Sequence, residues 1–302
     1  MIEEIGGDFL QWLRGFYFVA RRQSVTRASL DMRRNQPTIS HQIKCLENEF
    51  GVTLFDRSRG KMELTPEGKA FLDKAISVFE IIKEMKGEIS KSYLETQGKV
   101  IIAASHAIIH YFLPQYIVQF RKESPNVNFE LEGGGVEMII EKVESAEVDF
   151  GIASLNTVPD GIIYHDLFET GLRLLAPKDN SFFSGQELTL EQVARAPFIF
   201  FPHLSTITPL IERVFAKNHL KLNVVLVLNN FESVKKYVSL GTGISILDDY
   251  TLTEKDKDKL HIYPLDRFFE RRIYGLILRK QKYLSPPARA FLDRIKPDIL
   301  FK

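Results

Sequence analysis

Cysteine is almost missing from this sequence, because Cys45 is the only one among 302 residues. An internal disulfide is therefore excluded, as is usual for proteins of a reducing cytosol. Cys45 lies between Lys44 and Leu46 on a predicted helix, where we expect it to serve packing, with redox sensing as the alternative. The cysteine content thus predicts a cytoplasmic location.

Long apolar segments and common catalytic motifs are missing as well. No apolar run is long enough to span a bilayer, and the first residues, Met1–Glu4, have no basic region or signal-like core. The nucleophile elbow, the Gly-Lys-Ser/Thr phosphate loop and the His-Glu-x-x-His motif are absent. His106 and His110 are four residues apart, but no Cys, Asp or Glu lies near them in the sequence to complete a metal site. We therefore expect no membrane partner, no cofactor, no metal and no enzymatic activity.

Charge is nearly balanced over the whole chain but not along it. The formal net charge is +1, with ordinary fractions of hydrophobic (44%) and charged (26%) residues. The segment from Arg14 to Lys61 contains ten Lys or Arg and four acidic residues, so it carries a charge of +6. On a chain of this length, a local basic segment indicates two or three domains, one of which binds nucleic acid.

The N-terminal part has the periodicity of three helices. Apolar residues at helical spacing predict the first over residues 8–22. Thr26 is predicted to cap a short second helix, and Asn35 a third. Pro37 falls in the first turn of the third helix, where its missing N–H is harmless. A tight turn between the second and third helices predicts a helix-turn-helix.

The third helix has one apolar and one polar face. Ile39, Ile43, Leu46 and Phe50 follow at i, i+4, i+7 and i+11 and are predicted to face the core. The opposite face carries hydroxyl, amide and cationic side chains, which suit base edges and phosphates. The basic segment 57–61 is predicted to be the turn of a wing that contacts phosphate. Because of that wing, we prefer DNA recognition to an ordinary amphipathic surface helix.

A long helix is predicted from Pro66 to about Ser92. Its apolar residues are spaced alternately by four and three, which is typical of a seam between paired helices. The residues of this seam are Phe71, Ala75, Val78, Ile82, Met85 and Ile89. The spacing therefore predicts a dimerisation helix, with packing on its own domain as the alternative.

Beyond residue 98, short apolar strands alternate with helices. The predicted strands are 100–104, 127–131, 148–153, 172–176, 198–201, 224–228, 244–247 and 273–278. The predicted helices are 112–121, 136–143, 190–194, 207–218, 231–240 and 287–295. This alternation predicts mostly parallel sheets with helices on both faces.

Four motifs resemble the N-terminal domain of LysR-type transcriptional regulators. They are Ser24-Val25-Thr26-Arg27-Ala28, Gln36-Pro37-Thr38-Ile39-Ser40, Leu54-Phe55-Asp56-Arg57 and Leu64-Thr65-Pro66-Glu67-Gly68. Weaker similarity continues to the C-terminal end of the chain. Two residues depart from the family pattern: Asn35 stands where serine is usual, and Ser29 where alanine is usual. Asn35 can still cap the helix, whereas Ser29 would loosen the packing or touch phosphate.

The resemblance implies an α/β protein with an N-terminal all-α winged helix-turn-helix. It also implies a C-terminal two-lobed α/β effector domain of the periplasmic-binding-protein-like type 2. The expected boundaries are 1–65 for the DNA-binding domain, 66–95 for the linker helix and 98–302 for the effector domain. Lobe I is expected at about 98–160 and 268–302, and lobe II at about 161–267.

The implied function is regulation of transcription, as activator or repressor, by sequence-specific binding to double-stranded DNA under control of a small-molecule effector. The resemblance also implies a homodimer or homotetramer, and RNA polymerase is left open as a further partner. The residues expected to contact DNA are Thr26, Arg27, Arg34, Gln36, Pro37, Thr38, Ser40, His41, Lys44, Arg57 and Arg59.

The effector site is expected where strands of the C-terminal domain end. Ligands of open parallel sheets bind beyond the C-terminal ends of the strands, beside helix N-termini. The polar residues at such places are Ser105, His106, Gly134, Ser154, His203, Ser205, Thr206 and Asn229. Amides and hydroxyls suit a small anion or carboxylate, and the apolar residues around Ser105 suggest an effector with a hydrophobic part. Capping of the neighbouring helix is the alternative for each residue.

Two other functions remain open. The first is a small-molecule binding protein or enzyme with a DNA-binding-like appendage, which a buried acid–base group in the cleft would support. The second is an architectural DNA binder without an effector, which an occluded cleft would support.

Overall fold

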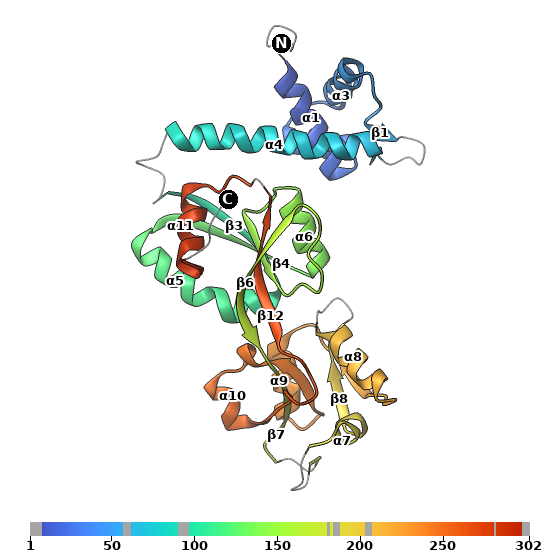
Figure 1. The fold of residues 1–302 in the computed structure, drawn as a ribbon, viewed down its shortest axis with the longest axis vertical. Coiled ribbons are helices and arrows are strands. Elements are labelled where there is room, and N and C mark those ends of the chain that lie inside the picture. The colour runs from blue at the N-terminus through green and yellow to red at the C-terminus, as the bar shows by residue number, and fades with distance from the viewer. Residues whose placement is uncertain are drawn as a thin grey trace. The chain divides into compact units, whose positions relative to one another are not determined.

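A computed structural model divides the chain into two compact units (Figure 1). The units are Met1–Ser90 with Gln281–Tyr283, and Lys91–Lys280 with Leu284–Lys302. The structure describes residues 8–56, 62–89, 97–179, 182–183, 188–202, 207–280 and 282–297. Over these ranges, no helix combines the length and the apolar character that crossing a membrane requires.

The N-terminal unit contains the three expected helices, a two-stranded wing and a long helix. In chain order its elements are α1 (Phe9–Arg22), α2 (Val25–Met32), α3 (Gln36–Phe50), β1 (Phe55–Asp56), β2 (Glu63–Leu64) and α4 (Pro66–Ile89). β1 and β2 pair antiparallel. This order is that of a winged helix-turn-helix.

Of the caps predicted for α2 and α3, one is confirmed. Asn35 is extended, and its side chain accepts a hydrogen bond from the Thr38 amide at 3.0 Å, as expected for a cap of α3. Thr26 does not cap α2. Ser24 takes that role, because it is extended and its Oγ accepts from the Arg27 amide at 3.3 Å, so that Thr26 lies inside the first turn.

The core of the N-terminal unit lies between α1 and α3. Ile39, Ile43 and Leu46 are fully buried, as their spacing predicts. Phe50 is 48% exposed, so its predicted burial is wrong. Phe50 is the last residue of α3, and its ring packs against the partly buried rings of Phe9 and Phe71.

α1 and α3 approach each other closely at Gly15. A Cβ atom there would lie 2.4 Å from Oε1 of Gln42, which is buried on α3. Glycine therefore permits the close crossing that holds α3 against α1.

The first half of the α4 seam packs within its own unit. Phe71, Ala75 and Val78 belong to the core formed with α1 and α3, which was the alternative interpretation of the seam. Further along α4, Ile81 and Met85 are 56% and 57% exposed.

The C-terminal unit has two lobes, each built on a sheet. The sheet of the first lobe has the order β4-β3-β5-β12-β6. Its strands are β3 (Gln97–Ala104), β4 (Asn126–Gly133), β5 (Phe150–Ala153), β6 (Ile162–Thr170) and β12 (Arg272–Arg279). Its helices are a π-helix (Ile108–Phe112), α5 (Leu113–Glu123), α6 (Val136–Glu144) and α11 (Pro286–Ile295). Buried apolar clusters lie on both faces of this sheet.

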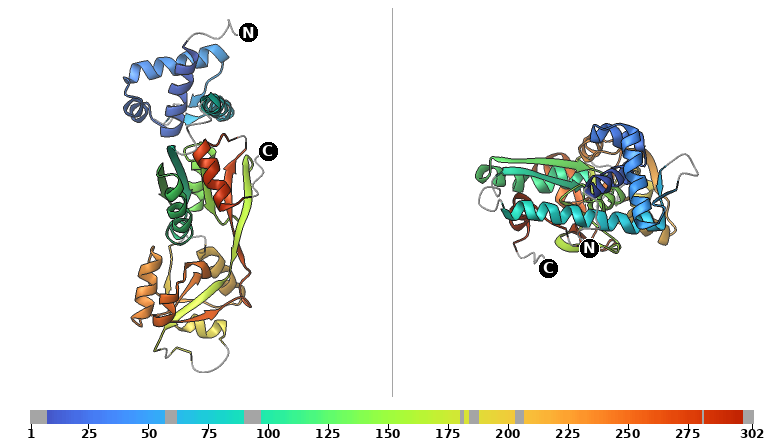
Figure 2. Two further views of the ribbon diagram at one scale, coloured as in Figure 1. Left: turned by 90° about the vertical axis from the view of Figure 1, so that its left-hand side faces the viewer. Right: turned by 90° about the horizontal axis from the view of Figure 1, so that it is seen from above.

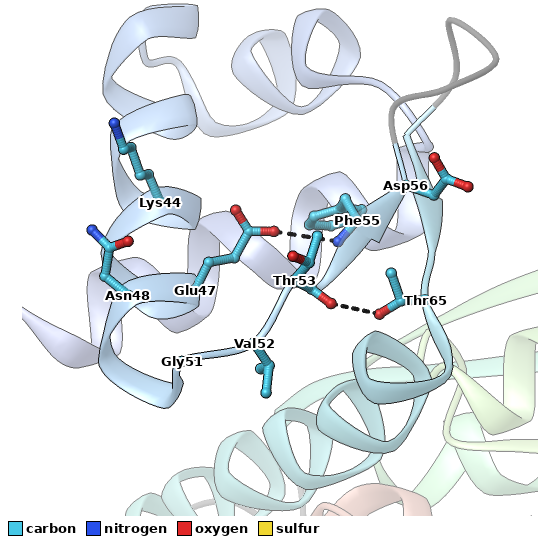
Figure 3. Close-up of a pocket in the computed structure, with 9 residues that line it drawn as sticks. All are labelled: Lys44, Glu47, Asn48, Gly51, Val52, Thr53, Phe55, Asp56 and Thr65. Atoms are coloured by element: carbon cyan, nitrogen blue, oxygen red, sulfur yellow. Dashed lines mark hydrogen bonds between the residues drawn. The ribbon is translucent and has the colours of Figure 1, made fainter.

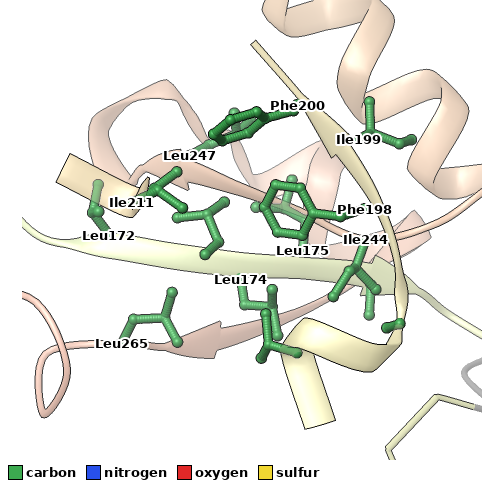
Figure 4. Close-up of a cluster of buried hydrophobic side chains, with 14 of the residues drawn as sticks. Leu172, Leu174, Leu175, Phe198, Ile199, Phe200, Ile211, Ile244, Leu247 and Leu265 are labelled. Carbon is green, nitrogen blue, oxygen red and sulfur yellow. The ribbon is translucent and has the colours of Figure 1, made fainter. Parts of the chain in front are cut away.

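The second lobe encloses a separate apolar core (Figure 4). One sheet has the order β10-β7-β11, and β8 pairs with β9 beside it. Its strands are β7 (Leu172–Pro177), β8 (Pro197–Phe200), β9 (Asn223–Val227), β10 (Ser245–Asp248) and β11 (Leu260–Pro264). Its helices are α7 (Leu190–Arg195), α8 (Thr208–Lys217), α9 (Phe231–Ser239), a 3-10 turn (Asp249–Thr251) and α10 (Glu254–Lys259).

Two long antiparallel strands, β6 and β12, carry the chain between the lobes (Figure 2). β6 stays in the first sheet to Thr170, so the chain enters the second lobe at Gly171 and not near residue 160. Mostly parallel sheets were also expected, but β12 runs antiparallel to both β5 and β6, and β7 antiparallel to both β10 and β11. For β6 and β12 the reason is that a chain that leaves a lobe and returns to it runs in opposite directions on the two crossings.

Candidate nucleic-acid interface and ligand cleft

The N-terminal unit presents one polar helix face to solvent. On α3, Gln36, Pro37, Ser40, His41 and Lys44 are exposed, opposite the buried face of the helix. Side chains that precede α3 are exposed as well, namely Thr26, Arg27 and Arg34. This face combines amide, hydroxyl, imidazole and cationic groups, which can bind base edges and phosphates.

Two hydroxyl groups near this face are already used within the protein. The Thr38 hydroxyl donates a hydrogen bond to Oδ1 of Asn35, and its side chain is half-buried. The Ser29 hydroxyl donates to the Thr26 carbonyl at 2.7 Å, and Ser29 is buried. Ser29 therefore does not reach phosphate. The Thr38 hydroxyl contributes to the cap of α3 and is not free to bind a base edge.

Glu47 links α3 to the wing (Figure 3). Its Oε1 accepts hydrogen bonds from the amides of Leu54 and Phe55, at 2.9 and 3.4 Å. The wing is also joined to the start of α4, because the Thr65 hydroxyl donates to the Thr53 carbonyl at 2.7 Å. The predicted wing contacts, Arg57 and Arg59, lie outside the described residues.

We expect Glu47→Ala to loosen the wing and to weaken DNA binding about tenfold, because hydrogen bonds to a carboxylate contribute roughly 1.5–3 kcal/mol. Hydrogen exchange of the Leu54 and Phe55 amides should become faster in the same variant. Glu49→Ala, which removes an exposed carboxylate from the same helix, is the matched control. Removal of a negative charge alone would favour DNA binding, so equal losses in both variants would mean that the wing contacts of Glu47 are not the cause.

Cys45 is half-buried beside the polar face of α3. Its Sγ lies 3.5 Å from Nε2 of His41, one helical turn away. The thiol therefore contacts a predicted DNA-binding side chain and is not part of the core.

The C-terminal unit contains a cleft of about 350 Å³ between its lobes. The first lobe contributes residues after β3, and the second lobe contributes residues that follow β9 and the first residues of α9. The lining residues are His106, Ile109, His110, Tyr111, Asn229, Asn230, Phe231 and Glu232. Two helices begin here, one after Ser105 and one capped by Asn230, whose side chain accepts from the Ser233 amide. Polar groups, apolar side chains and two helix N-termini thus meet in one cavity.

Of the eight predicted effector residues, His106 and Asn229 line this cleft. Ser105 Oγ accepts a hydrogen bond from the Ile108 amide, and the Gly134 amide donates to the Ala104 carbonyl, so both serve local structure. Ser154 is half-buried at the end of β5 and is not among the lining residues of this cavity. The remaining three, His203, Ser205 and Thr206, lie outside the described residues.

Tyr111 and Glu232, which line the cleft, and Lys235, which contacts both of them, were not predicted as effector-site residues. The Tyr111 hydroxyl donates to Oε1 of Glu232, which also accepts from Nζ of Lys235 at 3.1 Å. Burial and the Glu232 carboxylate raise the pKa of Tyr111 above its usual value. Burial alone would raise the pKa of Glu232, but the hydrogen bonds from Tyr111 and Lys235 lower it below the usual value. No local sequence signal joins Tyr111 to Glu232, because they are 121 residues apart.

Metal ligands do not gather in the part of the chain that the structure describes, since no three His, Cys, Asp or Glu side chains there form a possible site. His106 and His110 both line the cleft, but without a third such ligand.

Known proteins match both units. Residues 10–69 match the family described as "Bacterial regulatory helix-turn-helix protein, lysR family", and residues 95–298 match "LysR substrate binding domain". An uncharacterised HTH-type transcriptional regulator, YybE of Bacillus subtilis, is 28% identical over 284 residues, which cover 93% of this chain and 97% of the relative. The HTH-type transcriptional activator CmpR of Synechocystis sp. is 27% identical over 279 residues, which cover 92% and 91%.

Among solved structures, a full-length OxyR variant from Pseudomonas aeruginosa has the same fold. The match covers 95% of this chain and 94% of that chain, with a TM-score of 0.73 and 20% sequence identity. The fold is thus shared with that structure along nearly the whole chain.

Proposed function

The chain belongs to the LysR family of transcriptional regulators and is a DNA-binding regulator with an effector-binding C-terminal domain; on this premise we propose which of its residues serve each task. We propose that α3 enters the DNA major groove with Gln36, Ser40 and His41 against base edges. The observation that carries this assignment is the exposed polar face of α3, opposite a fully buried apolar face.

Cations around α3 bind the phosphate backbone in this proposal. They comprise described residues of α2, the turn and α3, together with the predicted wing. These cations are Arg27, Arg34, Lys44, Arg57 and Arg59. Thr26 and Pro37 stand at the first turns of α2 and α3, where close approach to the backbone suits small side chains. Thr38 supports this face through the cap of α3.

The effector binds in the cleft between the lobes and is a small anion or carboxylate with an apolar part. The N-termini of two helices open into the cleft, and unpaired helix amides attract anions. His106 and Asn229 supply side-chain donors, and Ile109 and Phe231 supply apolar contacts. His203, Ser205 and Thr206 lie outside the described residues, and their contact with the effector stays a prediction from sequence.

The assembly is a homodimer or homotetramer that works in the cytoplasm as a regulator and not as an enzyme. Ile81 and Met85 support pairing of α4, because they stay exposed on the half of the helix that continues past the core of its own unit. RNA polymerase is proposed as a further partner, through which activation would occur.

Native mass spectrometry of the full chain tests this function, with a short duplex from upstream of its own gene and a shuffled duplex as control. We expect dimers or tetramers that retain only the upstream duplex, and a small acidic ligand released on denaturation. A monomer that binds both duplexes equally, or neither, would contradict the assignment of α3 and α4. A ligand without acidic groups would contradict the assignment of the cleft.

A further inference from the structure

A polar cluster joins the two lobes at the mouth of the effector cleft. It consists of Tyr111 from the first lobe and Glu232, Lys235 and Asp256 from the second lobe. We call these four residues the interlobe clasp. Tyr111 lies on the π-helix between β3 and α5, whereas Glu232 and Lys235 are on the first turns of α9.

Lys235 is the centre of the clasp. The residue is only 4% exposed, and its ammonium group has three oxygen acceptors. They are Asp256 Oδ2 at 2.9 Å, the Thr251 carbonyl at 2.5 Å and Glu232 Oε1 at 3.1 Å. A buried ammonium requires such complete pairing, because an unpaired buried charge is strongly unfavourable.

The first lobe contributes Tyr111, which covers the Lys235 ammonium group. The Lys235 ammonium lies 4.6 Å from the centre of the Tyr111 ring, a cation–π distance. The Tyr111 hydroxyl also donates a hydrogen bond to the Glu232 carboxylate. Separation of the lobes would therefore break a charge-assisted hydrogen bond and expose the buried ammonium to water at the same time.

We propose that the interlobe clasp holds the effector cleft closed in the absence of effector and so sets how readily the domain responds. This inference rests on the proposed function of the cleft and concerns its regulation. Tyr111 and Glu232 are themselves lining residues of the cleft, so a ligand that enters it meets the clasp directly. A ligand that binds the open form more tightly than the closed form would shift the population toward open lobes. The size of this shift depends on how strongly the interlobe clasp favours the closed form.

Distances between the lobes test the clasp without an effector. Spin labels on the full chain at Glu141→Cys of α6 and Lys217→Cys of α8, both exposed, would report lobe separation by pulsed electron resonance. Cys45→Ser removes the native thiol, so that only the two introduced cysteines are labelled. Mixing with excess unlabelled chain ensures that each dimer or tetramer contains one labelled chain. We expect one narrow distance in this parent and about a tenfold larger open population in Tyr111→Phe, which keeps the ring but removes the hydroxyl.

Tyr116→Phe is the matched control, because the Tyr116 ring packs against Phe112 of its own lobe. Glu232→Gln should open the lobes less than Tyr111→Phe, since the amide oxygen still accepts from Tyr111. A Tyr111→Phe distribution that superimposes on those of the parent and Tyr116→Phe would overturn the clasp.

Failure of the clasp and failure of the proposed function give different results. The duplex assay on the same variants reports DNA binding independently of the lobe distance. If Tyr111→Phe left the distance between the lobes unchanged while the chain bound its DNA specifically, only the clasp would be rejected. Opened lobes in a chain that binds neither DNA nor an acidic ligand would support the clasp and reject the regulator's residue assignments.

Discussion

Replacing Asp248 with alanine is expected to lower the free energy of unfolding of the C-terminal unit by about 3–5 kcal/mol. Asp248 ends β10 and is 1% exposed. Both its carboxylate oxygens accept from Nη1 of Arg272, at 2.7 and 2.6 Å. Alanine would leave this buried guanidinium without its carboxylate, and an uncompensated buried charge is more costly than the lost contacts.

The surroundings of the pair leave little access to water. Tyr274 donates to Oδ2 of Asp248 at 3.2 Å, and burial raises the pKa of Tyr274 to about 12. Burial alone would lower the pKa of Arg272, but Asp248 raises it above the usual value. The Tyr250 ring packs against the Tyr274 ring, close to the start of β12, where the chain returns to the first lobe.

Asp249→Ala is the matched control for this prediction. The Asp249 side chain is 45% exposed and pairs with Arg173, which keeps Asp266 as a second partner. Its loss should therefore cost less than about 1 kcal/mol. Urea titration of the full chain, followed by hydrogen exchange of the β10 and β12 peptides, separates this unit from the other. Similar losses in both variants would show that removing the carboxylate beside the buried guanidinium costs no more than removing one from an exposed pair.

A double variant tests the physical reason for the effect. Asp248→Leu with Arg272→Met removes both charges and keeps much of the volume. Such replacements of buried ion pairs are often neutral or stabilising. We expect the double variant to regain most of the stability that Asp248→Ala loses.

Gln36→Ala and Lys44→Ala are expected to weaken DNA binding in different ways. Loss of an amide that pairs with a base edge reduces discrimination against the wrong base by about 1–3 kcal/mol. Gln36→Ala should therefore lose specific binding roughly 5- to 150-fold while binding to a shuffled duplex stays nearly constant. Lys44→Ala should weaken both duplexes alike and reduce the slope of log K against log salt concentration by about 1.

Fluorescence anisotropy titrations with both duplexes at several salt concentrations measure both effects. Lys74→Ala, which removes an exposed cation from α4, is the control for a general loss of charge. If Gln36→Ala and Lys44→Ala lowered specific and non-specific binding by the same factor, the separation of base and phosphate roles would be wrong. Thr38→Ala is a poor test of base contact, because its hydroxyl belongs to the cap.

Prediction from sequence worked best where local interactions decide structure. Asn35 caps α3 because a side chain three residues from the receiving amide needs no distant partner. Ile39, Ile43 and Leu46 are buried because their spacing defines one face of a single helix. Ser24 replaced Thr26 as the cap because two neighbouring hydroxyl residues carry similar signals, and only the backbone conformation chooses between them.

The strands β6 and β12 and the cleft were harder to predict for the opposite reason. β6 was not among the predicted strands, and its register follows from pairing with β12, more than a hundred residues away. Asp248 is the last residue of β10, a place where polar residues often meet a ligand, yet folding buries it against Arg272. Such pairings depend on distant parts of the chain that no local pattern connects.

The amino-acid sequence by itself determined the order of elements in the N-terminal unit, the buried and exposed faces of α3 and the family of this protein. These properties follow from side-chain spacing and capping over a few turns, where each residue interacts with neighbours in the chain. The tertiary structure alone decided which polar residues share the cleft, and that Tyr111 meets Glu232 and Lys235 across it. The physical reason is that ion pairs and hydrogen bonds between the lobes depend on how the two apolar cores are positioned relative to each other, and no local sequence pattern specifies that position.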